Sequence, residues 1–338
     1  MTSQHFCKLF ISLLLLCIPA HTESESFAQA KAIFEILKPN ILDFDIDAIL
    51  DNQQPVEILS ISENSKYKLI KKLENIINQG LFIDFLCPAF PFKSGNHDQN
   101  TISSNVDMTE YHSLKHLNQM IEAIKTIYPK VHFTIVTDGL LFADLFHIPD
   151  EIVLAYERDL KRLTKLLPHI TIKPIFQLLS HANQSLQTIR EEIGCIEKTQ
   201  LIPPPKNKKR FEILKARILQ EINHSNHPYF HMQAFDRVIY LEKIAQAVIA
   251  RDEFVKQFMK QFETANTIRL STHYQKDISE KIGIRFSNDS YVTPWNGVFV
   301  RKADGTVSIL RKREIDTHRF KLEHELHNNV ECAFYNWR

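Results

Sequence analysis

The stretch LFIDFLCPAFPFKSGN, residues 81–96, decides the fold because a strongly apolar run ends abruptly in proline, lysine, serine, glycine and asparagine. Such a run is typical of a strand that is covered on both faces, and the two prolines then stop sheet pairing. Lys93, Ser94 and Asn96 present a cation, a hydroxyl and an amide where strands of open α/β sheets usually end at ligand sites. A buried strand followed by a solvated turn is the alternative.

Helices are predicted on both sides of this strand. Residues 27–38 and 64–79 carry apolar side chains at helical spacing, and Gly80 is well placed to end the second helix. A third helix is predicted from Asp107 to Tyr128, because Asp107 and Glu110 have the spacing of a capping box.

The pattern of a strand ending in polar residues then repeats. Residues 131–136 are rich in β-forming side chains and end in Thr-Asp-Gly. Helices are expected over residues 149–167 and 184–192, with a further strand at 171–178. Alternating strands and helices imply an α/β fold, Rossmann-like, with a mostly parallel sheet flanked by helices.

The second half of the chain changes character twice. The stretch LIPPPKNKKR, residues 201–210, is a candidate linker or subdomain boundary, and its charges indicate a solvated surface because no aromatic stacking pattern accompanies them. Residues 211–262 are mostly helical in pattern. Short strands are expected from Thr267 onward, with Asp304-Gly305 as a hairpin turn. The fold therefore combines a helical N-terminal region with a short-stranded C-terminal part.

Composition excludes several kinds of protein. With 41 Lys plus Arg against 40 Asp plus Glu, no global field recruits nucleic acid. Only 7 glycines occur, and no GxGxxG or GxxxxGK[ST] motif is present, which argues against a nucleotide cofactor. The five scattered cysteines form no CxxC pair and are interpreted as separate reduced thiols.

The N-terminus, residues 1–26, is predicted to be signal-like or disordered. Within residues 1–20, Lys8 precedes an apolar run that ends in Pro19-Ala20, which resembles a short secretory signal. The run is too short to indicate a membrane span. Export or membrane tethering through this segment stays open, whereas the unpaired cysteines favour a cytoplasmic protein.

Polar residues at strand ends are the best candidates for chemistry. The 16 histidines match no zinc or iron template, so no metal is expected. Arg269, Ser271 and His273 are two residues apart, and in a strand they would share one face, where they would suit a phosphate or carboxylate. A salt bridge with surface polar groups is the alternative.

Several separated motifs resemble the pyoverdine/dityrosine biosynthesis family, the isocyanide (isonitrile) synthases. They are PAFPFKSGN at 88–96, DMTE at 107–110, TDGLLFADL at 137–145, IRLSTH at 268–273 and TPWNG at 293–297. The resemblance implies a single catalytic domain over residues 27–338. It also implies an enzyme that joins the amino group of tyrosine or tryptophan to a carbon of ribulose 5-phosphate, giving an isonitrile without a cofactor or metal.

The resemblance also suggests roles for individual residues. Lys93, Ser94 and Asn96 are expected to bind the sugar phosphate, and Arg269 with Ser271 a second anionic group. The remaining candidates are catalytic residues, namely His273, Asp138 and Glu110, and substrate contacts, namely Asp144, Thr293 and Trp295. Helix capping is a competing role for Asp144, and Glu110 is similarly ambiguous.

The motifs depart from the family pattern in two places. Asn296 stands where family members usually have histidine, and Gln99, Asn100 and Ser103 follow the first motif in place of the expected lysine and glycine. A separate Fe(II)/2-oxoglutarate oxygenase is implied as a pathway partner. Two alternatives remain: a sugar-phosphate lyase or isomerase, and an exported protein that binds a small anion. The sugar phosphate that the resemblance implies is made in the cytosol, and this favours a cytoplasmic location for the protein.

Overall fold

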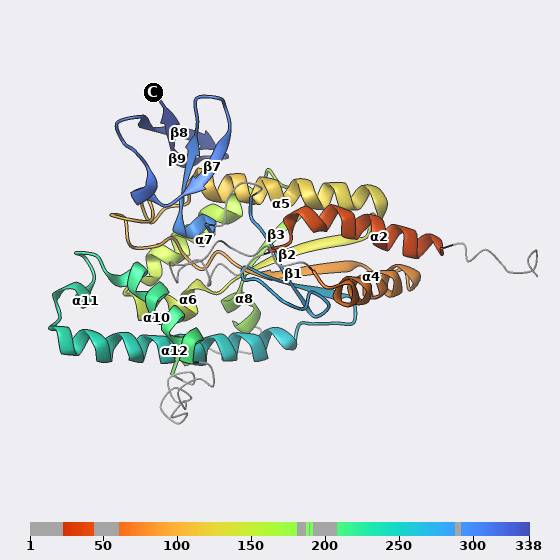
Figure 1. Ribbon diagram of the computed structural model, residues 1–338, viewed down its shortest axis with the longest axis horizontal. Coiled ribbons are helices and arrows are strands. Elements are labelled where there is room, and N and C mark those ends of the chain that lie inside the picture. Colours follow the sequence, from red (N-terminus) through yellow and green to blue (C-terminus); the bar gives the residue numbers. More distant parts are fainter. Residues whose placement is uncertain (1–22, 44–60, 181–186, 189, 192–207, 288–291) are drawn as a thin grey trace, which may run out of the picture.

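The computed structural model describes residues 23–43, 61–180, 187–188, 190–191, 208–287 and 292–338. A five-stranded parallel sheet with the order β3-β2-β1-β4-β5 lies at its centre (Figure 1). Its strands are β1 (Ile83–Pro88), β2 (Val131–Thr137), β3 (Ile170–Pro174), β4 (Thr267–Ser271) and β5 (Lys281–Gly283). The predicted Rossmann-like α/β class is confirmed.

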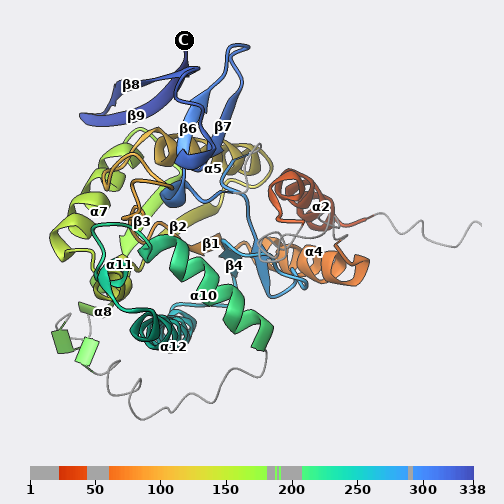
Figure 2. The same ribbon diagram turned by 60° about the vertical axis from the view of Figure 1, so that its left-hand side comes forward.

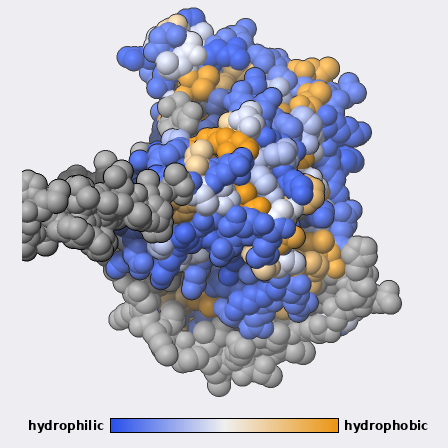
Figure 3. All heavy atoms as spheres, turned by 90° about the vertical axis from the view of Figure 1, so that its right-hand side faces the viewer, coloured by the Kyte–Doolittle hydropathy of each residue, from blue (hydrophilic) through white to orange (hydrophobic). Residues whose placement is uncertain are grey.

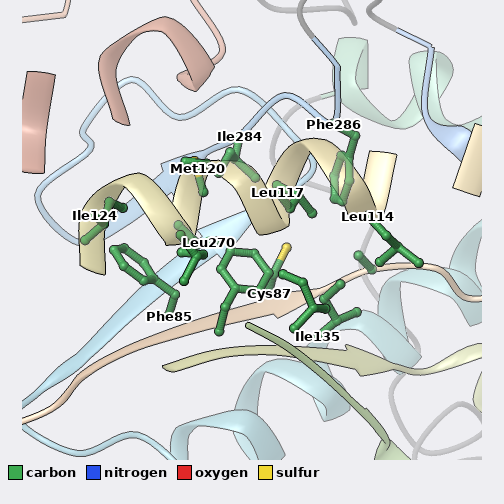
Figure 4. Packing of buried hydrophobic residues seen from close by; sticks show 14 of the residues in the cluster. Phe85, Cys87, Leu114, Leu117, Met120, Ile124, Ile135, Leu270, Ile284 and Phe286 are labelled. Atoms are coloured by element: carbon green, nitrogen blue, oxygen red, sulfur yellow. The ribbon is translucent and has the colours of Figure 1, made fainter. Parts of the chain in front are cut away.

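One face of the sheet is covered by three amphipathic helices, α2 (Glu25–Leu37), α4 (Glu63–Asn78) and α5 (Met108–Ile127). Leu114, Leu117 and Ile124 of α5 point onto Phe85 of β1 and its neighbours (Figure 4). The predicted capping box at the start of α5 and the end of α4 before Gly80 are both confirmed. A 3-10 turn, η1 (Lys38–Asn40), follows α2.

The opposite face is covered mainly by α10 (Lys208–Ile222) and α12 (Ala234–Lys260), which are joined through the short α11 (Pro228–His231) (Figure 2). These helices confirm the helical pattern predicted for residues 211–262. Four short or medium helical elements lie near β2 and the edge strand β3. They are α6 (Gly139–Phe142), η2 (Ala143–Phe146), α7 (Asp150–Thr164) and α8 (Ile175–Ser180).

Four predicted segments differ from the structure or lie largely outside the residues that it describes. The strand predicted at residues 171–178 is wrong in its second half, because β3 ends at Pro174, which has no N–H to extend the ladder, and α8 follows. Most of the helix predicted at 184–192 and most of the linker at 201–210 lie outside the described residues. The predicted signal within residues 1–20 lies outside them too.

A second, four-stranded sheet closes the chain with the order β7-β6-β9-β8. Its strands are β6 (Val298–Arg301), β7 (Val307–Leu310), β8 (Phe320–His327) and β9 (Val330–Trp337), with the turns η3 (Pro294–Asn296) and η4 (Lys312–Glu314) beside them. The hairpin expected at Asp304-Gly305 joins β6 to β7, and Gly305 has a φ of 80°. This sheet sits over the end of α5 (Figure 2).

The distribution of polar and apolar side chains is that of a protein with a packed apolar interior. The face shown in Figure 3 is mostly hydrophilic, with hydrophobic side chains in small separate groups. Cys87 and Cys332 are buried free thiols, as expected for reduced core residues. Within the described ranges, no helix combines the length and apolar character needed to cross a membrane.

Candidate active site

A cavity of about 640 Å³ lies at the carboxyl ends of β1, β2 and β4. The chain order in the sheet reverses between β1 and β4, and ligands of open α/β sheets bind at such a point. Helices α10 and α12, together with residues 292–296 and 311–314, complete the wall. The volume suits one or two small metabolites.

Two carboxylates, those of Asp138 and Asp252, line this cavity, and we call them the carboxylate pair. Asp138 follows β2 at the start of α6, but its side chain makes no capping hydrogen bond. Burial raises the pKa of Asp138 to about 7, and the charge of Asp252 adds to the effect. Asp252, on α12, is an exposed residue that lines the same cavity. At neutral pH Asp138 can therefore accept a proton or release one.

Three arginines and two glutamates form the other charged part of the wall. Arg217 and Glu221 come from α10, whereas Arg311, Arg313 and Glu314 come from the segment around η4. Arg311 donates a hydrogen bond to Gln220, and burial and the charge of Arg313 both lower the pKa of its guanidinium. We call the three arginines the guanidinium cluster, and its composition suits a phosphate or carboxylate.

Aromatic side chains supply much of the apolar wall. Phe92 packs against Phe146 with ring centroids 5.7 Å apart, and Phe142 lies nearby in the lining. Trp295 packs edge-on against Phe90, at a centroid distance of 5.3 Å. An aromatic ring of a ligand would therefore find a matching surface inside the cavity.

The structure brings only four of the residues predicted for the site to this cavity. These four are Asp138, His273, Thr293 and Trp295. The other seven do not line it, and each makes contacts elsewhere that account for its position.

Lys93 and Glu110 belong to a fully buried network. The Lys93 ammonium lies 2.9 Å from Asp107 and 2.8 Å from Glu110, and it donates hydrogen bonds to Thr109 and to the carbonyl of Pro294. Burial alone would lower the pKa of Lys93, but the two carboxylates raise it. Tyr156 donates to Glu110 at 3.0 Å. These contacts leave Lys93 away from the cavity, in contrast to the predicted sugar-phosphate contact.

Ser94 and Asn96 hold the loop after β1 against α10. The Ser94 hydroxyl donates to Glu221, and the Asn96 amide donates to the carbonyl of Gln220 at 2.7 Å. Both side chains are buried. Ser94 therefore contacts two residues of the cavity wall, Glu221 through its hydroxyl and the carbonyl of Trp295 through its backbone N–H at 2.9 Å, whereas Asn96 contacts the backbone of α10.

The expected shared face of Arg269, Ser271 and His273 does not form, because β4 ends at Ser271 and the chain turns before His273. Arg269 forms an ion pair with Glu263 at 2.9 Å, which is the alternative considered from the sequence. The buried Ser271 hydroxyl accepts a hydrogen bond from the backbone N–H of His273 at 3.1 Å. Ser271 thus shapes the turn that brings His273 to the cavity.

Asp144 connects η2 to α12. Its carboxylate accepts hydrogen bonds from both terminal nitrogens of Arg251, at 2.5 and 3.0 Å. Burial favours the neutral acid, but the Arg251 guanidinium outweighs it and lowers the pKa of Asp144. This pair holds α12 in place beside the cavity and leaves Asp144 outside its lining.

Helices α10 and α12 and the turn η4 contribute side chains to the cavity that the sequence motifs did not predict. On α10, Leu214, Arg217, Ile218 and Glu221 all line the cavity, and their spacing places them on one helical face. Charged residues within an otherwise apolar stripe were the available signal. For metals, the described part of the chain holds no group of three His, Cys, Asp or Glu side chains suitably placed for an ion.

A glycine fixes the approach of β2 to the loop after β1. A Cβ at Gly139 would lie 1.7 Å from the carbonyl oxygen of Pro91. Gly139→Ala should therefore lower the free energy of unfolding by about 1–3 kcal/mol, in the range of overpacked cores. Urea denaturation measures this. Gly95→Ala, whose Cβ meets only His224 at 3.8 Å, is the matched control, and equal stability of the two variants would contradict the prediction.

The fold and the cavity define a Rossmann-like α/β protein with a charged and aromatic ligand site at the switch point of its sheet. The family model of the pyoverdine/dityrosine biosynthesis protein matches residues 73–227 and 204–323, so the chain belongs to this family.

Individual relatives agree with this placement. The chain is 28% identical to an L-tyrosine isonitrile synthase of Pseudomonas aeruginosa, covering 73% of this chain and 78% of that protein. It is also 28% identical to an L-tryptophan isonitrile synthase of Fischerella ambigua, covering 72% and 75%. Isocyanide synthase A of Aspergillus fumigatus is 24% identical over 75% of this chain, which spans only 42% of that longer protein.

A solved structure has the same fold. The crystal structure of the PvcA protein from Pseudomonas aeruginosa matches with a TM-score of 0.72 at 21% identity, and the match covers 92% of this chain and 100% of that one.

Proposed function

We propose that the protein is an isonitrile synthase. Its substrates are an aromatic L-amino acid, tyrosine or tryptophan, and ribulose 5-phosphate as the carbon donor. Family membership and the names of the relatives support the reaction class. The strongest structural support is the division of one cavity into a carboxylate pair, a guanidinium cluster and an aromatic wall. An ammonium, an anionic group and an aromatic ring each have a chemical counterpart there.

The carboxylate pair suits the amino group. An amino acid arrives as its ammonium form, which a carboxylate attracts and can deprotonate. Asp138, whose pKa of about 7 lies near physiological pH, takes this proton and leaves a free amine. The amine adds to the C2 ketone of the sugar, and return of the proton releases one water and leaves a C=N bond. This C=N bond joins the C2 carbon to the nitrogen of the amino acid, as the isonitrile requires.

Other residues that line the cavity are placed to transfer protons or to hold the substrate. His273 is exposed to the cavity beside β4 and is the second candidate for proton transfer. Trp295 and the phenylalanines hold the aromatic ring, and Thr293 offers a hydroxyl beside them. The isonitrile product would then be available to a separate Fe(II)/2-oxoglutarate oxygenase.

Incubation of the purified protein with tyrosine or tryptophan and ribulose 5-phosphate labelled with ¹³C at C2 tests this proposal. The label should appear in an isonitrile carbon by NMR and mass spectrometry. An active isonitrile synthase under the same conditions is the positive control. No labelled isonitrile while that control works would refute the proposal, and sugar consumption without any amino acid would favour the lyase or isomerase.

A further inference from the structure

A set of contacts links the second sheet to the cavity. Arg311, at the end of β7, donates to Gln220, and the adjacent Glu221 accepts hydrogen bonds from Ser94 and, at 3.3 Å, from the Asn100 amide. Three parts of the chain distant in sequence thus meet at one corner of the cavity. One of them is the loop after β1, where the sequence predicted the sugar phosphate, and the other two are α10 and the segment after β7.

The position of η4 is fixed independently of any ligand. The backbone N–H groups of Lys312 and Arg313 donate to the carbonyls of Asn100 and Gln99, at 3.2 and 3.0 Å. The Lys312 ammonium donates to the carbonyl of His97. The backbone that carries Arg311 and Arg313 is therefore held against the loop after β1, so an anion would find these guanidinium groups already in position.

We propose that Arg311, Arg313 and Glu221 form the subsite for a phosphorylated polyhydroxyl compound, with the guanidinium groups on the phosphate and Glu221 on the hydroxyls. This inference rests on the proposed function, under which the compound is ribulose 5-phosphate.

The charges favour the phosphate at the arginines. A guanidinium offers a planar fork of N–H donors that matches two phosphate oxygens, and both arginines line the cavity. Each is partly engaged, Arg311 with Gln220 and Arg313 with the Gln99 side chain at 3.2 Å, but neither of these partners is charged. A phosphate that binds the two arginines would therefore displace only neutral glutamine side chains at these two contacts and no carboxylate.

The carboxylate of Glu221 suits hydroxyl groups. It would repel a phosphate, but it attracts O–H donors, and such charge-assisted hydrogen bonds are stronger than neutral ones. Ser94 and Asn100 each occupy one of its oxygens and fix its orientation. A carboxylate has about four lone-pair sites, so both oxygens can still accept from vicinal hydroxyls. The negative charge of Glu221 thus separates the polyol part of the subsite from the phosphate part.

Two substitutions distinguish these roles. Arg311→Gln should raise the KM for ribulose 5-phosphate roughly tenfold to a hundredfold, the loss of a charge-assisted contact, with little change in the KM for the amino acid. Glu221→Gln should raise it roughly tenfold. Inorganic phosphate, tested as a competitive inhibitor, separates the two: Arg311→Gln should weaken its binding, whereas Glu221→Gln should leave it unchanged or strengthen it.

Matched controls lie outside the cavity. Arg319→Gln removes an exposed arginine that pairs with Asp316, and Glu212→Gln removes an exposed carboxylate of α10 that pairs with Lys215. Both should retain wild-type kinetics. Arg311→Lys keeps the charge, and its sugar KM should lie between those of the wild type and Arg311→Gln, which separates the charge effect from misfolding.

The possible results distinguish a failure of the proposed subsite from a failure of the proposed function. If the wild type makes isonitrile but Arg311→Gln and Glu221→Gln keep its sugar KM, the subsite is wrong and the proposed function stands. If the wild type makes none, calorimetry with ribulose 5-phosphate decides: binding that both substitutions weaken supports the subsite, and no binding to the wild type overturns it.

Discussion

Asp138→Asn should lower kcat by about two to four orders of magnitude, the usual contribution of a positioned acid or base. Asparagine has the same shape but takes no proton, so the ammonium of the amino acid would stay protonated. The half-buried side chain makes no capping hydrogen bond, so stability should change little. Steady-state kinetics with the labelled-sugar assay measures the loss.

The pH profile gives the same prediction a second readout. Asp138 must be deprotonated to act as a base, so kcat/KM should rise with pH through about 7 and then level off. Asp252→Asn removes the negative neighbour that helps to raise the pKa of Asp138, and the rise should move to lower pH. Asp236→Asn, an exposed carboxylate near the start of α12, is the matched control. A wild-type pH profile in the Asp252 variant would contradict this coupling.

Lys93→Met should lower the free energy of unfolding by about 3–5 kcal/mol, as expected when one partner of a buried ion pair is removed. Asp107 and Glu110 would then lie buried without their cation. Because the ammonium also holds the carbonyl of Pro294, the turn that carries Trp295 should loosen as well. Urea denaturation measures the stability, and the KM values of both substrates should change together.

Two further variants make this prediction specific. Lys38→Met removes an exposed lysine that pairs with Glu35 on the surface, and it should have nearly wild-type stability. Adding Glu110→Gln to Lys93→Met should restore part of the loss, because one unpaired carboxylate is removed. If Lys93→Met kept full stability and raised only the KM for the sugar, the result would support the role of Lys93 in phosphate binding that the sequence predicted.

The sequence predicted the fold well because its signals are local. The apolar run of β1, the capping box of Asp107 and Glu110, and Gly80 after α4 each act within a few residues. The last hairpin was missed although it had a local signal. Asn328 and Asn329, both with positive φ, form the turn between β8 and β9, and asparagine is favoured there.

The site was predicted less well because side-chain direction in a loop is not a local property. Phe90 has a φ of 56°, unusual for a bulky residue, and the chain that follows carries Lys93 toward α5 instead of the cavity. Glu221 lies on a helix and Arg311 follows a strand of the second sheet, so only the folded chain brings their segments to Ser94. Asp138 was found because it directly follows its strand.

The pairing of β1 with β4 also has a consequence for folding kinetics. Asp84 lies opposite Thr267, whereas β1, β2 and β3 are consecutive strands of the chain. Contacts between residues so distant in sequence require closure of a long loop and slow the folding of a domain. We expect β1, β2 and β3 to associate before β4 joins them. Because the cavity opens at the junction of β1 and β4, catalytic competence would be among the last properties that the folding chain acquires.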